Sequence, residues 1–340
     1  MAFSFCYNKP MQTKTSKLYD WLFVVFASIQ VAGAFIDGWA HVHLDSALET
    51  FFTPWHAVFY FGLFGVSALV IGQYLLNLRK GYSWKNALPQ EYLVSLLGVG
   101  IMLLGGPGDF IWHAIFGIEQ GIEALLSPTH LLLAIGGAIM VSGPLHAIWY
   151  RPRNIHTGPT IISFALFMLT INFMLQFVQP FNFPWISPAF QAANPINFEY
   201  GVGLGVAGTI IFTGIFLGMI LACLKHWRFP LGSFTFTLTL NALALSFLEG
   251  NYPLIILGAL VSGILIDLLY QSLAGRLNQE KYLRLFGFIT PVLIFLPYEL
   301  VIMSTTGTNW SVHMWAGNIL ISGIAGLLMT YLIKPPEPIA

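Results

Sequence analysis

Charged residues are scarce in this sequence of 340 residues. Asp, Glu, Lys and Arg together make up 8% of it, whereas 56% is hydrophobic and the mean hydropathy is +0.75. A soluble globular domain carries about a quarter charged residues. The composition therefore excludes an ordinary soluble domain and predicts an integral protein of the lipid bilayer.

Cysteine is nearly absent as well, because the chain holds only Cys6 and Cys223. This excludes a Cys-based zinc or iron–sulfur motif. Both cysteines fall in or next to segments that the charge pattern assigns to the cytoplasm, where we expect no disulfide. No nucleotide-binding motif or basic patch is present, so we expect no nucleic-acid partner. Residues 1–17 are polar and lead to no small-residue cleavage site, so we expect no cleavable signal peptide.

Apolar runs of nearly twenty residues fill most of the chain. Each is long enough to cross a bilayer as a helix, whereas the strands of a membrane barrel would alternate over about ten residues. We therefore predict an all-α integral membrane protein with about ten transmembrane helices. The predicted spans are residues 18–37, 55–77, 91–111, 129–150, 159–179, 201–224, 231–248, 252–272, 284–305 and 312–333.

Lys and Arg are missing from every second connection between these runs. All fourteen basic residues fall near the termini or in connections on the same side of the predicted membrane. The positive-inside rule then predicts cytoplasmic N and C termini, in a membrane of the cytoplasmic or inner type. The extracytoplasmic side receives carboxylates and histidines with no cation beside them, which favours a bound metal ion.

Two stretches repeat one ordered set of residues, DGWAHVHLDSALETFFTPWH at 37–56 and DFIWHAIFGIEQGIEALLSPTH at 109–130. Each has an Asp, a His four positions later, two acids, a Pro and a closing His. The two sets are Asp37, His41, Asp45, Glu49, Pro54 and His56, then Asp109, His113, Glu119, Glu123, Pro128 and His130. We predict that residues 1–150 are a parallel repeat of two helix pairs. Residues 151–340 would then add six helices and a Pro-rich outer loop at 180–200.

The spacing within each stretch suits a metal site. Asp and His at i and i+4 lie on one face of a helix and can reach one ion, and the closing His can join them from the next helix. Two histidines and a carboxylate suit copper, iron or zinc better than calcium or magnesium. The predicted ligands are Asp37, His41, His56, Asp109, His113 and His130. The predicted outer-shell partners, which would orient the imidazoles, are His43, Asp45, Glu49, Glu119 and Glu123.

Few ionisable residues lie in the second half of the chain outside the basic connections. Glu299 falls within a predicted span, where a carboxylate is by default a candidate functional group. His313 begins the last span and is a second candidate. Asp267 suits either helix packing or gating.

Both stretches resemble the metal motifs of a known family. D-x3-H followed by FTPWHAVFYFG is similar to the first metal motif of the C subunit of copper membrane monooxygenases, the particulate methane and ammonia monooxygenases. D-x3-H followed by GIEALLSPTH is similar to that subunit's later motif, which reads Asn-x3-His, a glutamate-rich turn and Pro-x-His. The likeness covers the first four predicted helices.

The resemblance implies that Asp37, His41 and His56 form one copper site. It implies a neighbouring site at Asp109 and His113 that shares His56, and His130 matches the family's last motif histidine. This sequence differs from the family in three respects. Asp109 replaces the family's Asn, the gap from His41 to His56 is two residues longer, and predicted helices five to ten have no counterpart. No stretch resembles the cupredoxin domains of the family's B subunit.

By this likeness we expect a copper-dependent membrane oxidoreductase that holds one or two copper ions. It would use O2 to oxidise a small apolar or lipidic substrate reached from the lipid bilayer, alone, as a homo-oligomer or with partner subunits. The same donor set also accommodates iron or zinc.

Other functions fit the same residues. Zinc would give a membrane hydrolase that activates a bound water. A metal carrier or transporter would bind the ion without chemistry and would use Asp267 and Glu299 along its path. The chain would also suit a structural subunit of a larger membrane complex. In the plainest alternative, the matched residues only hydrogen-bond to one another.

Overall fold

The computed structural model is helical throughout the part of the chain that it describes. This part comprises residues 15–44, 52–119, 121–151, 155–249 and 254–334, and it contains no strand. The predicted all-α class is therefore confirmed. The chain divides into two compact units, and each is described by itself. Unit 1 is formed by residues 1–34, 49–119 and 126–167, and unit 2 by residues 35–48, 120–125 and 168–340.

Eight of the described helices are long and apolar enough to cross a membrane. They are α1 (Lys17–His43), α2 (Pro54–Arg79), α3 (Gln90–Phe116), α7 (Thr157–Met174), α9 (Phe198–Leu224), α11 (Ile255–Leu273), α12 (Glu280–Thr305) and α13 (Val312–Ile333). Helices α5 (Pro128–Val141) and α6 (Gly143–Tyr150) would together form a ninth span. A helical membrane protein is thus supported, whereas the number of ten spans, the cytoplasmic termini and the repeat stay predictions.

Two of the ten predicted spans differ from their expected form. The chain bends by 50° between α5 and α6, inside the expected span 129–150. Pro144 lies in the first turn of α6, where it supplies no N–H and its ring crowds the preceding turn. The seventh expected span is α10 (Ser233–Glu249), which has 17 residues and is shorter than the roughly 20 that cross a bilayer upright.

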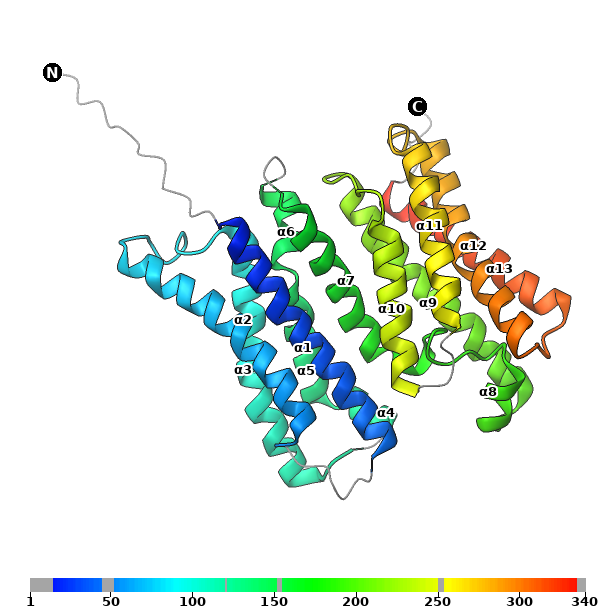
Figure 1. The fold of residues 1–340 in the computed structure, drawn as a ribbon, viewed down its shortest axis with the longest axis horizontal. Helices are drawn as coiled ribbons and strands as arrows, with labels where there is room; N and C mark the ends of the chain where they lie inside the picture. Colours follow the sequence, from blue (N-terminus) through cyan, green and yellow to red (C-terminus); the bar gives the residue numbers. More distant parts are fainter. Residues whose placement is uncertain (1–14, 45–51, 120, 152–154, 250–253, 335–340) are drawn as a thin grey trace. The chain divides into compact units, whose positions relative to one another are not determined.

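Unit 1 is held together by close helix contacts at glycines. A Cβ on Gly33 of α1 would lie 2.4 Å from the backbone nitrogen of Phe59 on α2. A Cβ on Gly98 of α3 would lie 2.4 Å from the backbone nitrogen of Met140 on α5. Figure 1 shows α2, α3 and α5 packed together within this unit. Small residues let helix backbones approach in this way, which is how membrane helices gain packing energy.

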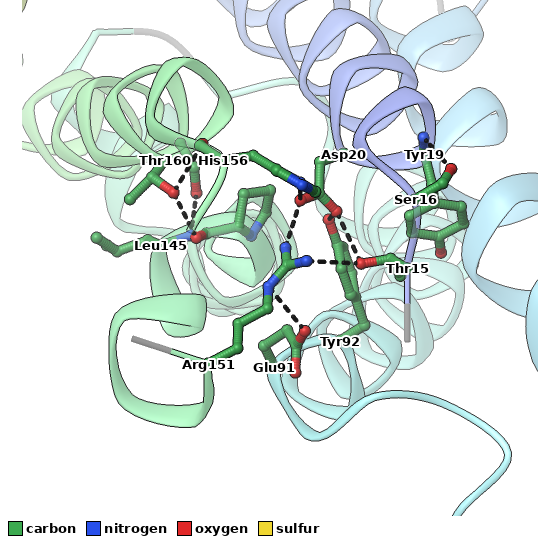
Figure 2. A network of polar contacts seen from close by, with 12 residues as sticks. Thr15, Ser16, Tyr19, Asp20, Glu91, Tyr92, Leu145, Arg151, His156 and Thr160 are labelled. Carbon is green, nitrogen blue, oxygen red and sulfur yellow. Dashed lines mark hydrogen bonds and ion pairs between the residues drawn. The ribbon is translucent and has the colours of Figure 1, made fainter. Parts of the chain in front are cut away.

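A buried polar cluster joins the starts of α1, α3 and α7 in unit 1 (Figure 2). The carboxylate of Asp20 is fully buried, and it accepts a 2.7 Å hydrogen bond from Tyr92 and ion-pairs with Arg151. His156 Nδ1 lies 2.5 Å from Asp20 Oδ2, and Arg151 Nε lies 3.1 Å from Glu91 Oε1. The guanidinium thereby compensates two buried carboxylates, which would otherwise cost several kcal/mol each.

Unit 2 contains the bundle of α9 to α13, in which α10 packs on α11, α11 on α12, α12 on α13 and α13 on α9. The segment expected as a loop at 180–200 is partly helical, with α8 at Pro188–Ala193, next to the short 3-10 helix η2 (Gln176–Val178). Phe181, Trp185 and Phe190 of this segment are buried. The segment therefore belongs to the core of unit 2.

Candidate metal site

Two groups of side chains could hold a metal ion, and they are the predicted ligand sets. One is Asp37, His41 and His56, and the other is Asp109, His113 and His130. In the group of Asp109, His113 and His130, one potential ligand atom per residue lies within 4.8 Å of the others. The second group lies entirely within unit 1 and is described below.

The packing of α3 on α5 turns Asp109 toward the next helix. Gly98, Met102, Gly105 and Asp109 are buried and recur at steps of four, three and four residues, so they share one helix face. The ideal Cβ position of Gly105 meets the side chain of Leu133 at 2.9 Å, and Asp109 meets Thr129. The helices therefore run antiparallel and bring the end of α3 to the start of α5.

The carboxylate of Asp109 lies between two imidazoles. Its Oδ2 is 3.4 Å from His113 Nε2, and its Oδ1 is 3.4 Å from His130 Nε2. The Asp109 side chain is 8% exposed, and those of His113 and His130 are 18% and 29% exposed. The two imidazole rings lie 5.4 Å apart, centre to centre. One acid and two nitrogen donors thus converge at the junction of α3 and α5.

These separations fit an ion between the three groups. A charge-assisted N–H···O bond is normally about 2.7–2.9 Å long, shorter than either of the two contacts. Ligand atoms about 2.0–2.1 Å from a tetrahedral ion lie about 3.3 Å from each other. The observed 3.4 Å contacts, one to each oxygen of Asp109, are longer than directly bonded partners and leave room for an ion beside the carboxylate.

The other nitrogen of His113 is hydrogen-bonded to one acceptor and lies close to a second. Its Nδ1 lies 3.2 Å from the carbonyl oxygen of Gly117 and 3.0 Å from Glu119 Oε2. Because both neighbours accept, Nδ1 carries the hydrogen, and in the neutral imidazole the lone pair is on Nε2, facing Asp109. Gly117 reaches this place with φ 85°, which favours glycine. The Oε1 of Glu119 accepts a hydrogen bond from Trp112 Nε1 at 2.5 Å.

A hydroxyl at the start of α5 holds His130. Ser127 caps the helix ahead of Pro128, and its Oγ accepts the backbone N–H of His130 at 3.4 Å. The same oxygen lies 2.8 Å from His130 Nδ1, which leaves Nε2 facing Asp109. The first stretch repeats this arrangement in α2, where Thr53 Oγ1 lies 2.7 Å from His56 Nδ1 and accepts the His56 backbone N–H at 3.2 Å.

Two contacts around this group were not foreseen in the sequence. Thr129 donates a 2.7 Å hydrogen bond from its hydroxyl to Asp109 Oδ1, and Ser127 orients His130. The available signal was the shared pattern Ser/Thr-Pro-x-His, which places a capping hydroxyl three residues before each closing histidine. Trp55 occupies the place of Thr129 in the first stretch, so that stretch lacks this hydroxyl.

The remaining predicted residues are placed as follows. On α1, His41 Nε2 lies 3.6 Å from Asp37 Oδ2. His43 stacks on Trp39 with ring centres 4.8 Å apart, and its Nδ1 contacts the Trp39 carbonyl. Glu123 is exposed in the short α4 (Ile122–Leu126). Asp45 and Glu49 lie outside the described residues.

The two candidates of the second half differ in environment. Glu299 of α12 is fully buried, and His313 in the first turn of α13 is exposed. Both belong to unit 2.

The geometry as a whole offers a carboxylate and two imidazoles whose Nε2 atoms converge, each imidazole being held through Nδ1. Such a donor set suits a borderline transition metal better than a cation that prefers oxygen ligands. In comparisons with known proteins, no family model, no curated protein and no solved structure matches the chain.

Proposed function

We propose that this protein is a copper-dependent membrane oxidoreductase of the monooxygenase type. It oxidises a small apolar or lipidic substrate at a metal site near the extracytoplasmic face. The observation that carries the proposal is the donor set of Asp109, His113 and His130, with both Nε2 atoms directed at one carboxylate. The motif resemblance described above favours copper within the metals that such a set accepts.

The roles of the side chains follow from their contacts. Asp109, His113 and His130 would hold the ion, and copper there would supply redox chemistry toward O2. Thr129 fixes one oxygen of Asp109 by its 2.7 Å hydrogen bond. Glu119 accepts a hydrogen bond from Trp112 and lies close to Nδ1 of His113, so it helps to orient that ring.

Exposed apolar side chains near this group in the sequence suit a substrate that arrives through lipid. Phe110, Ile111 and Ile115 on α3 are 50%, 56% and 67% exposed, and they sit beside Asp109 and His113 in the sequence. In a bilayer, exposed side chains of this kind face hydrocarbon. A small apolar molecule would therefore concentrate next to the site before it reacts.

The proposal also covers the membrane orientation, the second ligand group and the supply of electrons. The missing Lys and Arg on one side would place this end of α3 outside the cytoplasm, with both termini inside. Asp37, His41 and His56 would hold a second ion. Partner subunits or a second copy of the chain would supply the electrons that O2 chemistry requires.

The first test is metal content together with turnover. The protein would be purified from its native membrane without chelators and compared with His113→Ala, with His146→Ala as the control. His146 contacts only its own helix region through the Ser142 carbonyl and the Trp149 ring in the described contacts. We expect copper and substrate-dependent O2 uptake in the parent and in the control. In His113→Ala we expect loss of O2 uptake and of the copper bound by the Asp109 group.

Two results would contradict the proposal. Zinc as the sole bound metal, without O2 uptake, would favour the hydrolase. A metal content that His113→Ala leaves unchanged would leave the duplicated residues as hydrogen-bonded structure.

A further inference from the structure

One buried carboxylate in unit 2 lacks a partner for one of its oxygens. Glu299 of α12 is 0% exposed, and its Oε1 accepts a 2.7 Å hydrogen bond from Asn318 Nδ2 on α13. Its Oε2 is buried and has no hydrogen-bond partner within the described part of the chain. α12 is one of the helices long and apolar enough to span a membrane. A carboxylate in this position is a functional candidate.

Asp267, the other buried acid of the bundle, is an example of a carboxylate with a structural role. Asp267 of α11 is 2% exposed, and both of its oxygens accept hydrogen bonds at the start of α10. Oδ1 receives the backbone N–H of Phe234 at 3.4 Å, and Oδ2 receives the N–H and the hydroxyl of Thr235 at 2.9 and 2.6 Å. Asp267 thus anchors a helix N-terminus, where a negative charge is stabilised. Glu299 has no such set of donors.

No described contact supplies Glu299 with a positive charge. The helices packed against α12 are α9, α11 and α13. Apart from the residues near the basic ends of these helices, their titratable groups are Glu199, Tyr200, Asp267 and His313, of which Tyr200 is exposed. Glu199 and His313 are exposed, and Asp267 is bound to α10. On α12 itself, Tyr298 donates its hydroxyl to the Pro180 carbonyl at 2.7 Å. An ionised carboxylate buried without a cation costs several kcal/mol, and a bound proton removes that cost.

Asn318 can form a hydrogen bond with Glu299 in both protonation states of the carboxyl group. With the carboxylate ionised, Asn318 donates its amide hydrogen to Glu299 and accepts the Thr209 hydroxyl at 2.7 Å. If the amide rotates by half a turn, its oxygen accepts a hydrogen from protonated Glu299 and its nitrogen donates to Thr209 Oγ1. Thr209 then donates to the Val206 carbonyl, which already lies 2.8 Å away. Each state keeps a continuous chain of hydrogen bonds.

We propose that Glu299 is a reversible proton-binding site inside the membrane-spanning bundle of unit 2, with Asn318 and Thr209 as its switchable hydrogen-bond partners. The ligand is the proton itself, which needs one oxygen and no shell of further ligands. This site is independent of the metal group in unit 1. It would give unit 2 a charge change within the bilayer, as proton-moving membrane proteins require.

The first experiment is infrared difference spectroscopy on the full chain in lipid nanodiscs, between acid and alkaline buffer. Exposed carboxyl groups also protonate in acid, so we look for a separate C=O band, at the higher frequency of a carboxyl group shielded from water, that disappears as the pH rises. The band should be absent from Glu299→Gln, which keeps the acceptor for Asn318, and present in Glu199→Gln, a control on an exposed acid of the same unit. A band that Glu299→Gln retains would overturn the proposal.

A second measurement uses the unsubstituted protein. The hydrophobic reagent N,N′-dicyclohexylcarbodiimide modifies protonated carboxyl groups, and mass spectrometry of peptides locates the adduct. We expect modification at Glu299 that decreases with rising pH and is the same with sodium or with a large organic cation in the buffer. Protection by sodium at constant pH would assign the site to a metal cation and refute the proton. No adduct at any pH would refute it as well.

A third comparison tests the switchable partner. Asn318→Leu removes both the donor and the acceptor that face Glu299, so the pH midpoint of the infrared band should move. Ser322→Ala removes only a hydroxyl that donates to the Asn318 backbone carbonyl at 2.9 Å, and it should leave the midpoint in place. Equal midpoints in both variants would show that Asn318 plays no part in proton binding.

Discussion

The contact between α3 and α5 can be tested by adding one methyl group. In Gly98→Ala, the new Cβ would lie 2.4 Å from the Met140 nitrogen and 2.7 Å from both the Met140 Cα and the Gly136 oxygen. Ordinary contact begins at 3.4 Å, so α5 must move away by about 1 Å. All of these atoms are backbone, and no side-chain rotation can relieve the clash. Overpacking of this kind typically costs about 1–3 kcal/mol.

The matched control is Gly100→Ala in the same helix. The Cβ of this variant would meet nothing within 4 Å, and the position is exposed. Both substitutions change helix propensity by the same amount, so the difference between their free energies of unfolding isolates the packing cost. We expect Gly98→Ala to be less stable than Gly100→Ala by about 1–3 kcal/mol.

The displacement of α5 in Gly98→Ala should also change the geometry of the candidate metal site. The α3–α5 contact continues from Gly98 through Gly105 to Asp109, whose oxygen lies 3.4 Å from His130 Nε2. Separating the helices by about 1 Å should weaken copper binding at least tenfold, as loss of supporting contacts does in other metal sites. Unfolding in detergent micelles and copper titration measure the two effects. Equal stability and equal affinity in the two glycine variants would refute the helix packing described here.

Two further predictions concern single side chains. Thr129→Val keeps the shape of the side chain but removes the 2.7 Å hydrogen bond to Asp109, so copper affinity should fall about 10–100-fold in a titration. An unchanged affinity would contradict a supporting role of this hydrogen bond at a metal ligand. Arg151→Met leaves the buried Asp20 and Glu91 without their cation and should lower the free energy of unfolding by about 3–5 kcal/mol. A loss below about 1 kcal/mol, typical of surface pairs, would contradict the buried cluster.

Local periodicity made part of the fold and the site predictable. Run length and hydropathy sufficed for an all-α chain with membrane-spanning helices, because a helix in lipid must satisfy its own backbone and needs about 20 apolar residues. The i, i+4 spacing likewise placed Asp37 with His41 and Asp109 with His113 on one helix face, as the 3.6 Å and 3.4 Å contacts bear out.

The features that could not be predicted from the sequence depend on contacts between distant segments or on competing local effects. The Asp20 cluster joins residues more than a hundred positions apart, and no periodicity signals it. The break between α5 and α6 follows from Pro144, which hydropathy averages over. The helix α8 and the buried aromatic residues around it lie in a proline-rich stretch that is typical of a loop.

The most direct test of the metal site is electron paramagnetic resonance of the copper-loaded protein. The account predicts a copper(II) signal with couplings to two imidazole nitrogens. One of these couplings should vanish in His130→Ala, while the control His146→Ala should give the parent spectrum. A spectrum that His130→Ala leaves unchanged, or protein that takes up no copper, would contradict the assignment of Asp109, His113 and His130 as ligands.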